Sequence, residues 1–251
     1  MKEKISTIVI TFNSEATIEK CLKSAMSISD EIIIVDSFST DRTVEICKNY
    51  TKKIFTHKWL GYSKQKEIAV EKAVNSWILW IDSDEELSSE LIFEIQSLNF
   101  SCSAYYLNRK NYYLNRWINH CGWYPDYIIR LFRKDKGRFS NDIIHEKVVI
   151  NGKIDQIKGI LYHYSYRDIS HHLEKMNSFT SAIAQKMFQQ NKKVTPLTII
   201  FHSVWYFFRT YILKKGYLDG FAGFIVCVLG GYYVFLKYIK LWELYKYKVL
   251  K

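Results

Sequence analysis

The first hundred residues alternate between apolar runs of strand type and helical stretches, and this alternation limits the folds open to the chain. The strand-type runs are ISTIVITF, EIIIVD, KKIFTH and WILWID, each rich in β-branched or aromatic residues. Helices are predicted after them, over 15–26 and 41–50 and in the stretches SKQKEIAVEKAV and SSELIFEIQSL. Four such βα units predict a parallel sheet with right-handed crossovers and helices on both faces. In such a sheet, ligands bind beyond the carboxyl ends of the strands.

The last of these apolar runs, Trp77 to Ile81, leads directly into a cluster of acids in SWILWIDSDEELS. Burying a carboxylate without a partner costs roughly several kcal/mol, so Asp82 and Asp84 mark the end of a buried strand. Two carboxylates separated by one residue can bind one hard divalent cation while a nucleotide diphosphate supplies further ligands. Alternatively, residues 83–86 cap the next helix and complement its dipole.

The pattern of strand and helix signals changes after residue 104. Short aromatic strands broken by glycines extend to about His163, which predicts a mixed or antiparallel second half. A long helix is predicted from about Asp168 to Gln190, and Pro196 starts another. One face of the long helix has apolar residues spaced by three or four, namely Ile169, Leu173, Met176, Phe179, Ile183 and Met187. The predicted organisation is an α/β domain over 1–165 and a helical region over 166–251.

The carboxyl-terminal region combines positive charge with apolar and aromatic stretches. From residue 192 to 251 there are ten Lys or Arg and two acids, which is +8 of the chain's net charge of +11. The run FAGFIVCVLGGYYVFL has sixteen uncharged residues, slightly fewer than the ~18 expected of a spanning helix. We expect two helices that lie in or dip into a membrane interface, with basic side chains at the headgroups. Two core helices of a soluble protein are the alternative.

The placement of the cysteines and the amino-terminal segment indicate the cellular compartment of the protein. The five cysteines are scattered without a CxxC pair, which predicts reduced thiols in the cytosol. The start MKEKISTIVITF has an interrupted apolar stretch and no small-residue cleavage site, so we expect no signal peptide.

Three segments resemble the family 2 glycosyltransferases, whose catalytic domain has the GT-A fold. They are IVITFNSEATIEKCLKSA, EIIIVDSFSTDRTVEIC and the DSD acids, in that order, over roughly residues 4–98. The resemblance implies that Asn13 and Asp36 contact the uracil and ribose of a UDP-sugar, with Glu15 near the base. Ser39 or Thr40 is expected to cap the following helix.

The stretch GYSKQKEIAVEKA resembles the family's Gly-x-x-x-Gln-Lys-Asn segment, which approaches the diphosphate of the donor. The resemblance implies that Lys64 and Lys66 supply positive charge there. Glu67 stands where the family usually has Asn, and a solvated helix face is the alternative for each lysine. The predicted nucleotide-sugar site consists of Thr11, Asn13, Glu15, Asp36, Lys64, Lys66, Asp82 and Ser83.

The segments GWYPDYIIRLFRKDKGRFSNDIIHEKV and LYHYSY narrow the resemblance to the branch that includes lipopolysaccharide core β-glucosyltransferases. The resemblance implies that Glu146 is the catalytic base. It also implies that His163 joins Asp84 and Asp82 as ligands of a divalent metal, Mg²⁺ or Mn²⁺. Asp126 is the alternative base, and Asp142 a weaker one.

Together these features predict an inverting, metal-dependent glycosyltransferase with a GT-A domain, divided into a nucleotide-sugar half over 1–98 and an acceptor half over 99–165. The expected donor is a UDP-sugar, and the expected acceptor is a lipid-linked glycan. An anionic membrane surface is the third expected partner, at the cytoplasmic face of the inner membrane. Two alternatives are a nucleotidylyltransferase of similar fold and a non-catalytic polyanion-binding protein. The acid cluster opposes nucleic-acid binding.

Overall fold

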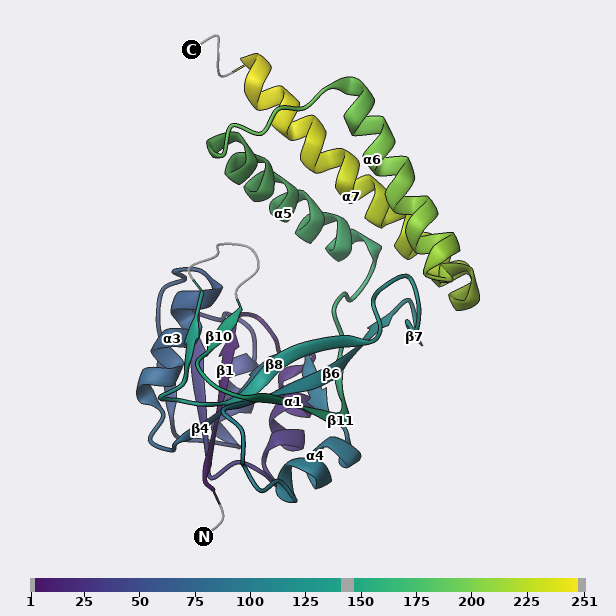
Figure 1. Ribbon diagram of the computed structural model, residues 1–251. Helices are drawn as coiled ribbons and strands as arrows, with labels where there is room; N and C mark the ends of the chain where they lie inside the picture. The colour runs from purple at the N-terminus through teal and green to yellow at the C-terminus, as the bar shows by residue number, and fades with distance from the viewer. Residues whose placement is uncertain (1–2, 141–146, 248–251) are drawn as a thin grey trace. The chain divides into compact units, whose positions relative to one another are not determined.

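The computed structural model describes residues 3–140 and 147–247 and divides into two compact units, each visible in Figure 1. The sheet unit comprises residues 1–110 and 126–164, and the helical unit comprises residues 111–125 and 165–251. Residues 111–125 therefore group with the carboxyl-terminal helices, although the sequence suggested that they belong to the α/β domain. The functional division into a catalytic domain over 1–165 and a membrane-associating region stays a prediction.

The sheet unit has a parallel part followed by an antiparallel part, as predicted. Its strands lie in the order β3-β2-β1-β4-β8-β6-β11-β5. The parallel strands are β1 (Ile5–Thr11), β2 (Glu31–Asp36), β3 (Ile54–Thr56) and β4 (Trp77–Asp82). The others are β5 (Glu85–Leu87), β6 (Ala104–Tyr113), β8 (Asp126–Arg133) and β11 (Ile154–His163). β8 is antiparallel to β4 and β6, and β5 is antiparallel to β11.

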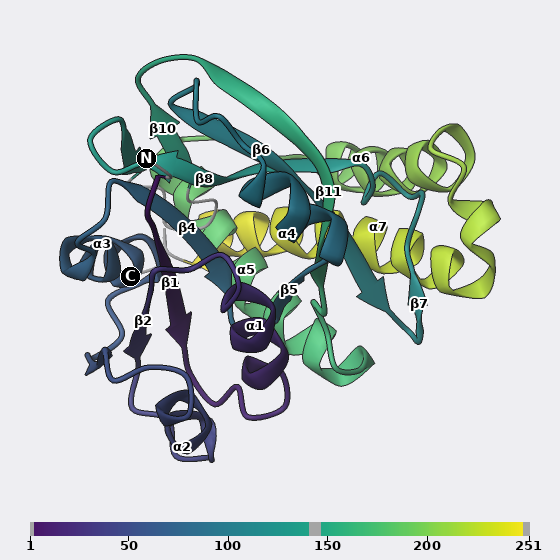
Figure 2. The same cartoon turned by 90° about the horizontal axis from the view of Figure 1, so that it is seen from below.

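Helices cover both faces of the parallel strands because β1 and its neighbours are apolar on both sides. Val9 belongs to the core formed with α1 (Ile18–Ala25), α2 (Thr43–Lys48) and α4 (Ser89–Gln96). Its neighbour Ile8 belongs to the core formed with α3 (Tyr62–Lys72). Figure 2 shows β1 between α3 on one side and α1 on the other. Successive strand residues point to opposite faces, and a strand buried on both faces is therefore continuously apolar.

Short strands were the elements that sequence periodicity did not predict. They are β5, β7 (Arg116–Trp117) and β9 (Gly137–Phe139), the last of which pairs with β10 (Val148–Ile150). A strand of two or three residues is too short to show a period of two.

The helical unit contains α5 (Ile169–Gln189), α6 (Pro196–Phe208) and α7 (Gly220–Tyr247). Asp168 accepts a hydrogen bond from the His171 backbone at 2.7 Å, so α5 starts where the sequence predicted. The predicted apolar face of α5 is wrong in part. The buried residues are His172, Met176, Thr180 and Ala184, whereas Ile169 and Leu173 are exposed.

Between α6 and α7 the chain forms a π-helical turn, η1 (Arg209–Leu213), and a 3₁₀ turn, η2 (Gly216–Asp219). The two helices approach closely at Gly230, where a Cβ would lie 2.3 Å from the Tyr206 ring. Small residues allow such close packing of helices.

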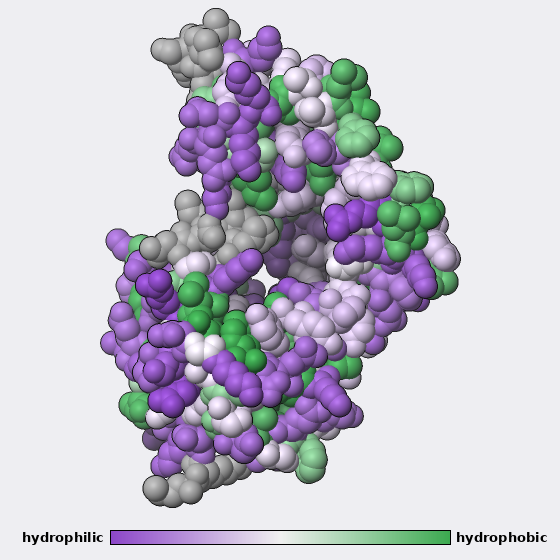
Figure 3. All heavy atoms as spheres, viewed as in Figure 1, coloured by the Kyte–Doolittle hydropathy of each residue, from purple (hydrophilic) through white to green (hydrophobic). Residues whose placement is uncertain are grey.

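The stretch from Gly216 to Tyr247 is long and apolar enough to cross a membrane, and 28% of its most apolar window is buried. Figure 3 shows hydrophobic residues gathered over α6 in the same unit. α6 exposes large apolar side chains, among them Leu197, Phe201 and Val204.

Candidate functional site

Three strand ends of the sheet unit carry the predicted polar residues to one edge. Thr11 of β1 is in register with Asp36 of β2, and Ile10 is in register with Asp82 of β4. All three strands are parallel, so their carboxyl ends meet at this edge, where an open α/β sheet binds its ligands.

The turns after β1 and β2 are bound to each other. Asp36 is buried and accepts hydrogen bonds from the Ser39 backbone at 2.9 Å and the Ser39 hydroxyl at 2.5 Å. The Asn13 backbone donates to that hydroxyl at 2.9 Å, and Asn13 Oδ1 accepts from the Thr40 backbone at 2.8 Å. The expectation that Ser39 or Thr40 caps α2 is therefore wrong, because the two residues bind Asp36 and Asn13. The N-cap of α2 is Arg42, without a side-chain hydrogen bond.

Glu15 links the same two turns from the outside. Its carboxylate accepts from the Arg42 backbone at 3.0 Å, while its own N–H donates to Asp41 at 3.1 Å. α1 accordingly begins at Ile18 rather than at Glu15. Beneath these turns, the Thr11 hydroxyl oxygen is buried and has no hydrogen-bond partner within the described part of the chain.

Asp82 lies in a network of buried charges. One carboxylate oxygen lies 3.3 Å from Lys66 Nζ and the other lies 2.7 Å from Arg130 Nη2. The same Arg130 nitrogen donates to Glu85 at 2.5 Å, and the second Glu85 oxygen accepts from the Asp82 backbone at 2.9 Å. Lys66, Arg130 and Glu85 are each 2% exposed or less. Buried ions need partners of this kind because the protein interior solvates charge poorly.

Trp80 lies against both cations of this network. Its ring centroid is 3.7 Å from Lys66 Nζ and 3.3 Å from the Arg130 guanidinium carbon. A cation over an aromatic face gains further attraction when it is desolvated. Burial raises the pKa of Asp82, but the charges of Lys66, Arg130 and His163 outweigh burial and hold that pKa well below its usual range. Asp82 is thus a fixed anion at the strand end.

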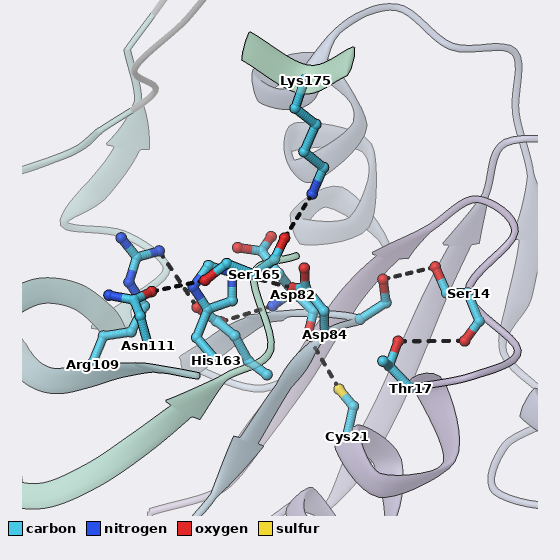
Figure 4. A network of polar contacts seen from close by, with 12 residues as sticks. Ser14, Thr17, Cys21, Asp82, Asp84, Arg109, Asn111, His163, Ser165 and Lys175 are labelled. Atoms are coloured by element: carbon cyan, nitrogen blue, oxygen red, sulfur yellow. Dashed lines mark hydrogen bonds and ion pairs between the residues drawn. The ribbon is translucent and has the colours of Figure 1, made fainter. Parts of the chain in front are cut away.

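Asp84 and His163 form the second feature of the edge (Figure 4). The His163 Nε2 atom lies 3.5 Å from Asp84 Oδ1, and both side chains are partly exposed. Next to them, the Ser83 and Ser14 hydroxyls are 2.9 Å apart, which connects the acid turn to the turn after β1. A carboxylate suits Mg²⁺ or Mn²⁺, ions that also keep waters and substrate phosphates, and an imidazole fits Mn²⁺ better than the harder Mg²⁺.

The structure brings two of the three predicted metal ligands together. Asp82 is instead held by Lys66 and Arg130. Among residues 3–140 and 147–247, no group of three His, Cys, Asp or Glu side chains could hold a metal ion. A metal at this edge would therefore take Asp84 and His163 from the protein and complete its coordination with phosphate and water.

Of the predicted bases, Glu146 and Asp142 lie outside the described residues. Asp126 extends the charge network. One of its oxygens accepts from Arg109 Nε at 2.9 Å and Nη2 at 2.7 Å, and another Arg109 nitrogen lies 3.7 Å from Glu85.

The two lysines of α3 have different surroundings. Lys64 is 60% exposed and pairs with Glu67 at 2.6 Å, which is the solvated helix face given as the alternative. For Lys66 that alternative is wrong, because its side chain is 2% exposed and paired with Asp82. Glu67, the acid at the family's Asn position, has a structural role here, because its carboxylate binds Lys64.

The acid cluster does not cap the next helix, so that alternative is wrong as well. Glu85 and Glu86 lie in β5, and the N-cap of α4 is Ser88, whose hydroxyl accepts from the Leu91 backbone at 3.1 Å. Glu86 accepts from the Tyr164 hydroxyl at 2.9 Å. Glu85 and Glu86 are therefore held within the sheet unit by Arg130 and Tyr164, rather than placed at the start of α4.

Cys21 lies beneath the acids, and its thiol donates to the Asp82 carbonyl at 3.4 Å. Burial, followed by the charges of Glu85, Asp84 and Asp82, raises the pKa of Cys21 well above its usual value. A thiol in this state is not a nucleophile.

Sequence reasoning did not predict the roles of Arg130, Arg109 and Glu85. A signal was present in YIIRLFRK, where Arg130 interrupts an apolar strand. A buried arginine requires a buried acid, and the surplus of acids at 82–86 supplies it.

Comparisons with known proteins show what the whole chain is similar to. The family model described as "Glycosyl transferase family 2" matches residues 6–145. "Uncharacterized glycosyltransferase RT0209" from Rickettsia typhi is 36% identical over 96% of this chain and 88% of its own length. "Lipopolysaccharide core biosynthesis glycosyltransferase LpsC" from Rhizobium meliloti is 28% identical over 96% of this chain and 93% of its own.

Among solved structures, the mannosyltransferase PcManGT from Pyrobaculum calidifontis, in complex with GDP-Man and Mn²⁺, matches with a TM-score of 0.55. The match covers 96% of this chain and 88% of that chain at 11% sequence identity. At this identity the likeness concerns the fold alone.

Proposed function

Because the chain belongs to glycosyl transferase family 2, we propose that it transfers a sugar from a nucleoside diphosphate donor to a lipid-linked glycan, with inversion and with a divalent metal. The observation that carries this proposal is the Asp84–His163 pair beside the fixed Asp82 anion, at the edge where β1, β2 and β4 end.

Family membership confirms two of the sequence predictions. The chain is a glycosyltransferase, and its sheet unit has the α/β architecture expected of the GT-A fold, with a mixed sheet in which β1 to β4 are parallel. The family match also favours the glycosyltransferase prediction over the nucleotidylyltransferase and the polyanion-binding protein.

The nucleoside of the donor would bind at the linked turns after β1 and β2. Asp36 and Asn13 are prearranged there by Ser39 and Thr40. We propose uridine as the nucleoside because the resemblance of the segments around Asn13 and Asp36 to the family implies that these two residues contact uracil and ribose. A rigid site loses little entropy when the ligand binds.

The diphosphate would lie at the acid turn. Asp84 and His163 would hold the metal, which supplies Lewis-acid stabilisation of the negative charge that develops on the leaving diphosphate. Lys66 and Arg130 keep Asp82 ionised and fixed, and so position the turn that carries Asp84. This preorganisation means that the site does not need to reorganise during the reaction.

A carboxylate must take the proton of the acceptor hydroxyl as the new bond forms. We propose Glu146 for this role, with Asp126 as the alternative. One oxygen of Asp126 already accepts from two donors of Arg109, so that oxygen is less available for an incoming hydroxyl.

The acceptor is proposed to be a glycan on a lipid, as in lipopolysaccharide core synthesis. Two observations support this proposal. One is the similarity over most of the chain to LpsC, which is named for lipopolysaccharide core biosynthesis. The other is the apolar stretch Gly216–Tyr247, which would rest in or on the cytoplasmic face of the inner membrane. Holding the enzyme on the surface that carries the acceptor raises the effective concentration of the acceptor.

The test is nucleoside diphosphate release from a panel of UDP-sugars and GDP-mannose, with Mn²⁺, Mg²⁺ or a chelator. We expect one UDP-sugar to be hydrolysed slowly without acceptor, and chelation to abolish the release. Asp84→Asn should lower the rate by about 100-fold or more, because metal stabilisation amounts to several kcal/mol. Asp135→Asn, which alters an exposed acid of the same unit, is the matched control.

A second comparison addresses the base. Glu146→Gln should bind the donor normally but lose transfer to a lipid extract by about 10²–10⁴-fold, the usual contribution of general base catalysis. If Asp126→Asn shows this behaviour instead, the base is Asp126. Donor turnover that survives both chelation and Asp84→Asn would refute the metal-dependent mechanism.

A further inference from the structure

The helical unit contains a pocket of about 320 Å³ where the loop over 119–125 meets the turn after α6. Its lining residues are Asn119, His120, Gly122, Tyr124, Pro125, Leu213, Lys214 and Lys215. All of them belong to the helical unit. The lining includes two lysines and a histidine and no acidic side chain, so the pocket favours an anion.

A buried carboxylate holds the loop side of the pocket in place. Asp219 is 1% exposed and accepts from the backbone N–H groups of Asn119, at 3.1 Å, and His120, at 2.7 Å. It also lies 3.1 Å from His120 Nδ1. Asp219 is not a lining residue, and its oxygens are engaged by the loop. The negative charge of Asp219 therefore orders the pocket wall and is paired with His120, so the cations that the pocket offers to a ligand are the two lysines.

The other wall is anchored to the same loop. The Cys121 N–H donates to the Lys214 carbonyl at 3.2 Å. A Cβ at Gly122 would lie 2.6 Å from Lys214 Nζ, so the Lys214 side chain extends over the space that this glycine leaves open. Gly122 also has a φ of +78°, which side-chain-bearing residues rarely adopt. The lysine is thus held at the pocket by local structure.

Large apolar side chains are exposed in the chain segments beside the lysines. Leu213 is 59% exposed, Leu218 53% and Phe221 77%. A small free anion would not contact these apolar side chains. Exposed apolar residues next to cations are the arrangement that binds lipid, with the phosphate at the cations and the acyl chains on the apolar residues.

We propose that this pocket binds the phosphate of an anionic phospholipid headgroup, with the acyl chains against the exposed residues of 213–221. We call the pocket and these residues the elbow. The inference deepens the proposed membrane association, on which it rests, by naming the ligand and the side chains that select it. It is independent of the donor chemistry, because its test involves no turnover.

The first experiment measures flotation of the full-length chain with phosphatidylcholine vesicles, with and without phosphatidylglycerol. Each lysine at an anionic surface contributes about 1 kcal/mol, so Lys214→Ala/Lys215→Ala should weaken binding to the anionic vesicles on the order of 30-fold. The matched control is Lys192→Ala/Lys193→Ala, two exposed lysines at the other end of α6. It removes the same charge, and we expect a loss of less than about threefold. Circular dichroism checks that both variants are folded.

Lys214→Arg/Lys215→Arg should keep the affinity, because a phosphate also accepts from guanidinium groups. Equal losses in the elbow and control variants would overturn the inference, since binding would then depend on net charge alone, while the membrane association itself would stand. If the wild-type chain binds neither vesicle, both the association and the elbow fail.

A soluble probe distinguishes a lipid from a free phosphate ester. We expect the chain to bind dihexanoylphosphatidic acid below its micelle concentration, and to bind glycerol 3-phosphate at least tenfold more weakly. Equal affinity for the two compounds would overturn the assignment to lipid, because the exposed apolar residues would then contribute nothing.

Discussion

Replacing Arg130 with Met removes the central cation of the buried network at the end of β4 and leaves a side chain of similar length. Arg130 is 1% exposed and binds Asp82 at 2.7 Å and Glu85 at 2.5 Å. Without it, the fully buried Glu85 side chain loses its close cation, and Arg109 lies at 3.7 Å.

Removing one partner from a buried ion pair typically costs about 3–5 kcal/mol, because the remaining charge is left uncompensated. Asp82 is 27% exposed and retains Lys66, so water and the lysine compensate it in part. We therefore expect the lower end of that range, about 3 kcal/mol of the free energy of unfolding of the sheet unit.

Hydrogen–deuterium exchange of backbone amides in β4 and β8, followed by mass spectrometry, measures this loss within the sheet unit alone. The matched control is Arg133→Met. Arg133 lies in the same strand as Arg130 and pairs with Asp135 through two contacts of 3.0 Å, but both side chains are about half exposed. An exposed pair contributes about 1 kcal/mol or less.

A double variant separates the loss of charge compensation from a loss of packing. In Glu85→Gln/Arg130→Met the buried acid is neutral, while the glutamine oxygen can still accept from the Asp82 backbone. We expect the double variant to recover about 1 kcal/mol or more relative to Arg130→Met alone. If Arg130→Met costs no more than Arg133→Met, the buried network does not stabilise the unit and the reasoning is refuted.

Two further predictions concern other parts of the chain. Burial, followed by the charges of His171 and Lys175, lowers the pKa of His172 to about 4, whereas an unfolded histidine titrates near ~6.5. Only the unfolded state binds a proton between these values, so the helical unit should lose about 3 kcal/mol as the pH falls through this window. Near-UV circular dichroism melts measure this, and a slope that persists in His172→Gln would contradict it. Gly159→Ala should cost about 1–3 kcal/mol, because the added Cβ would lie 2.4 Å from the backbone of Leu91 in α4. Faster amide exchange in α4 would show it, and unchanged exchange would mean that β11 and α4 are not in such close contact.

Much of the fold could be predicted because short stretches of the sequence identify the main strands and the starts of helices. The apolar runs before Thr11, Asp36 and Asp82 are strands buried on both faces, and such strands need no partner information to be recognised. Asp168 and Pro196 began their helices as expected, since capping acts over three or four residues.

Predictions that depended on distant partners were less complete. The buried face of α5 differs from its most apolar face because His172 and Thr180 face the neighbouring elements, where His172 binds the Tyr113 hydroxyl at 2.9 Å. Ser39 was expected to cap a helix but binds Asp36 and Asn13. Side-chain hydroxyls have several local partners available, and the tertiary structure selects among them.

The sequence by itself determined the order of the longer strands and helices, the acids at the end of β4 and the resemblance that assigns the family, because all of these are local in the chain. The tertiary structure decided how the acids are used. Asp82 and Arg130 are 48 residues apart, and they meet only because β8 lies beside β4 in the sheet. The energy of a buried charge depends on where its counter-charge lies, and no local pattern contains that distance.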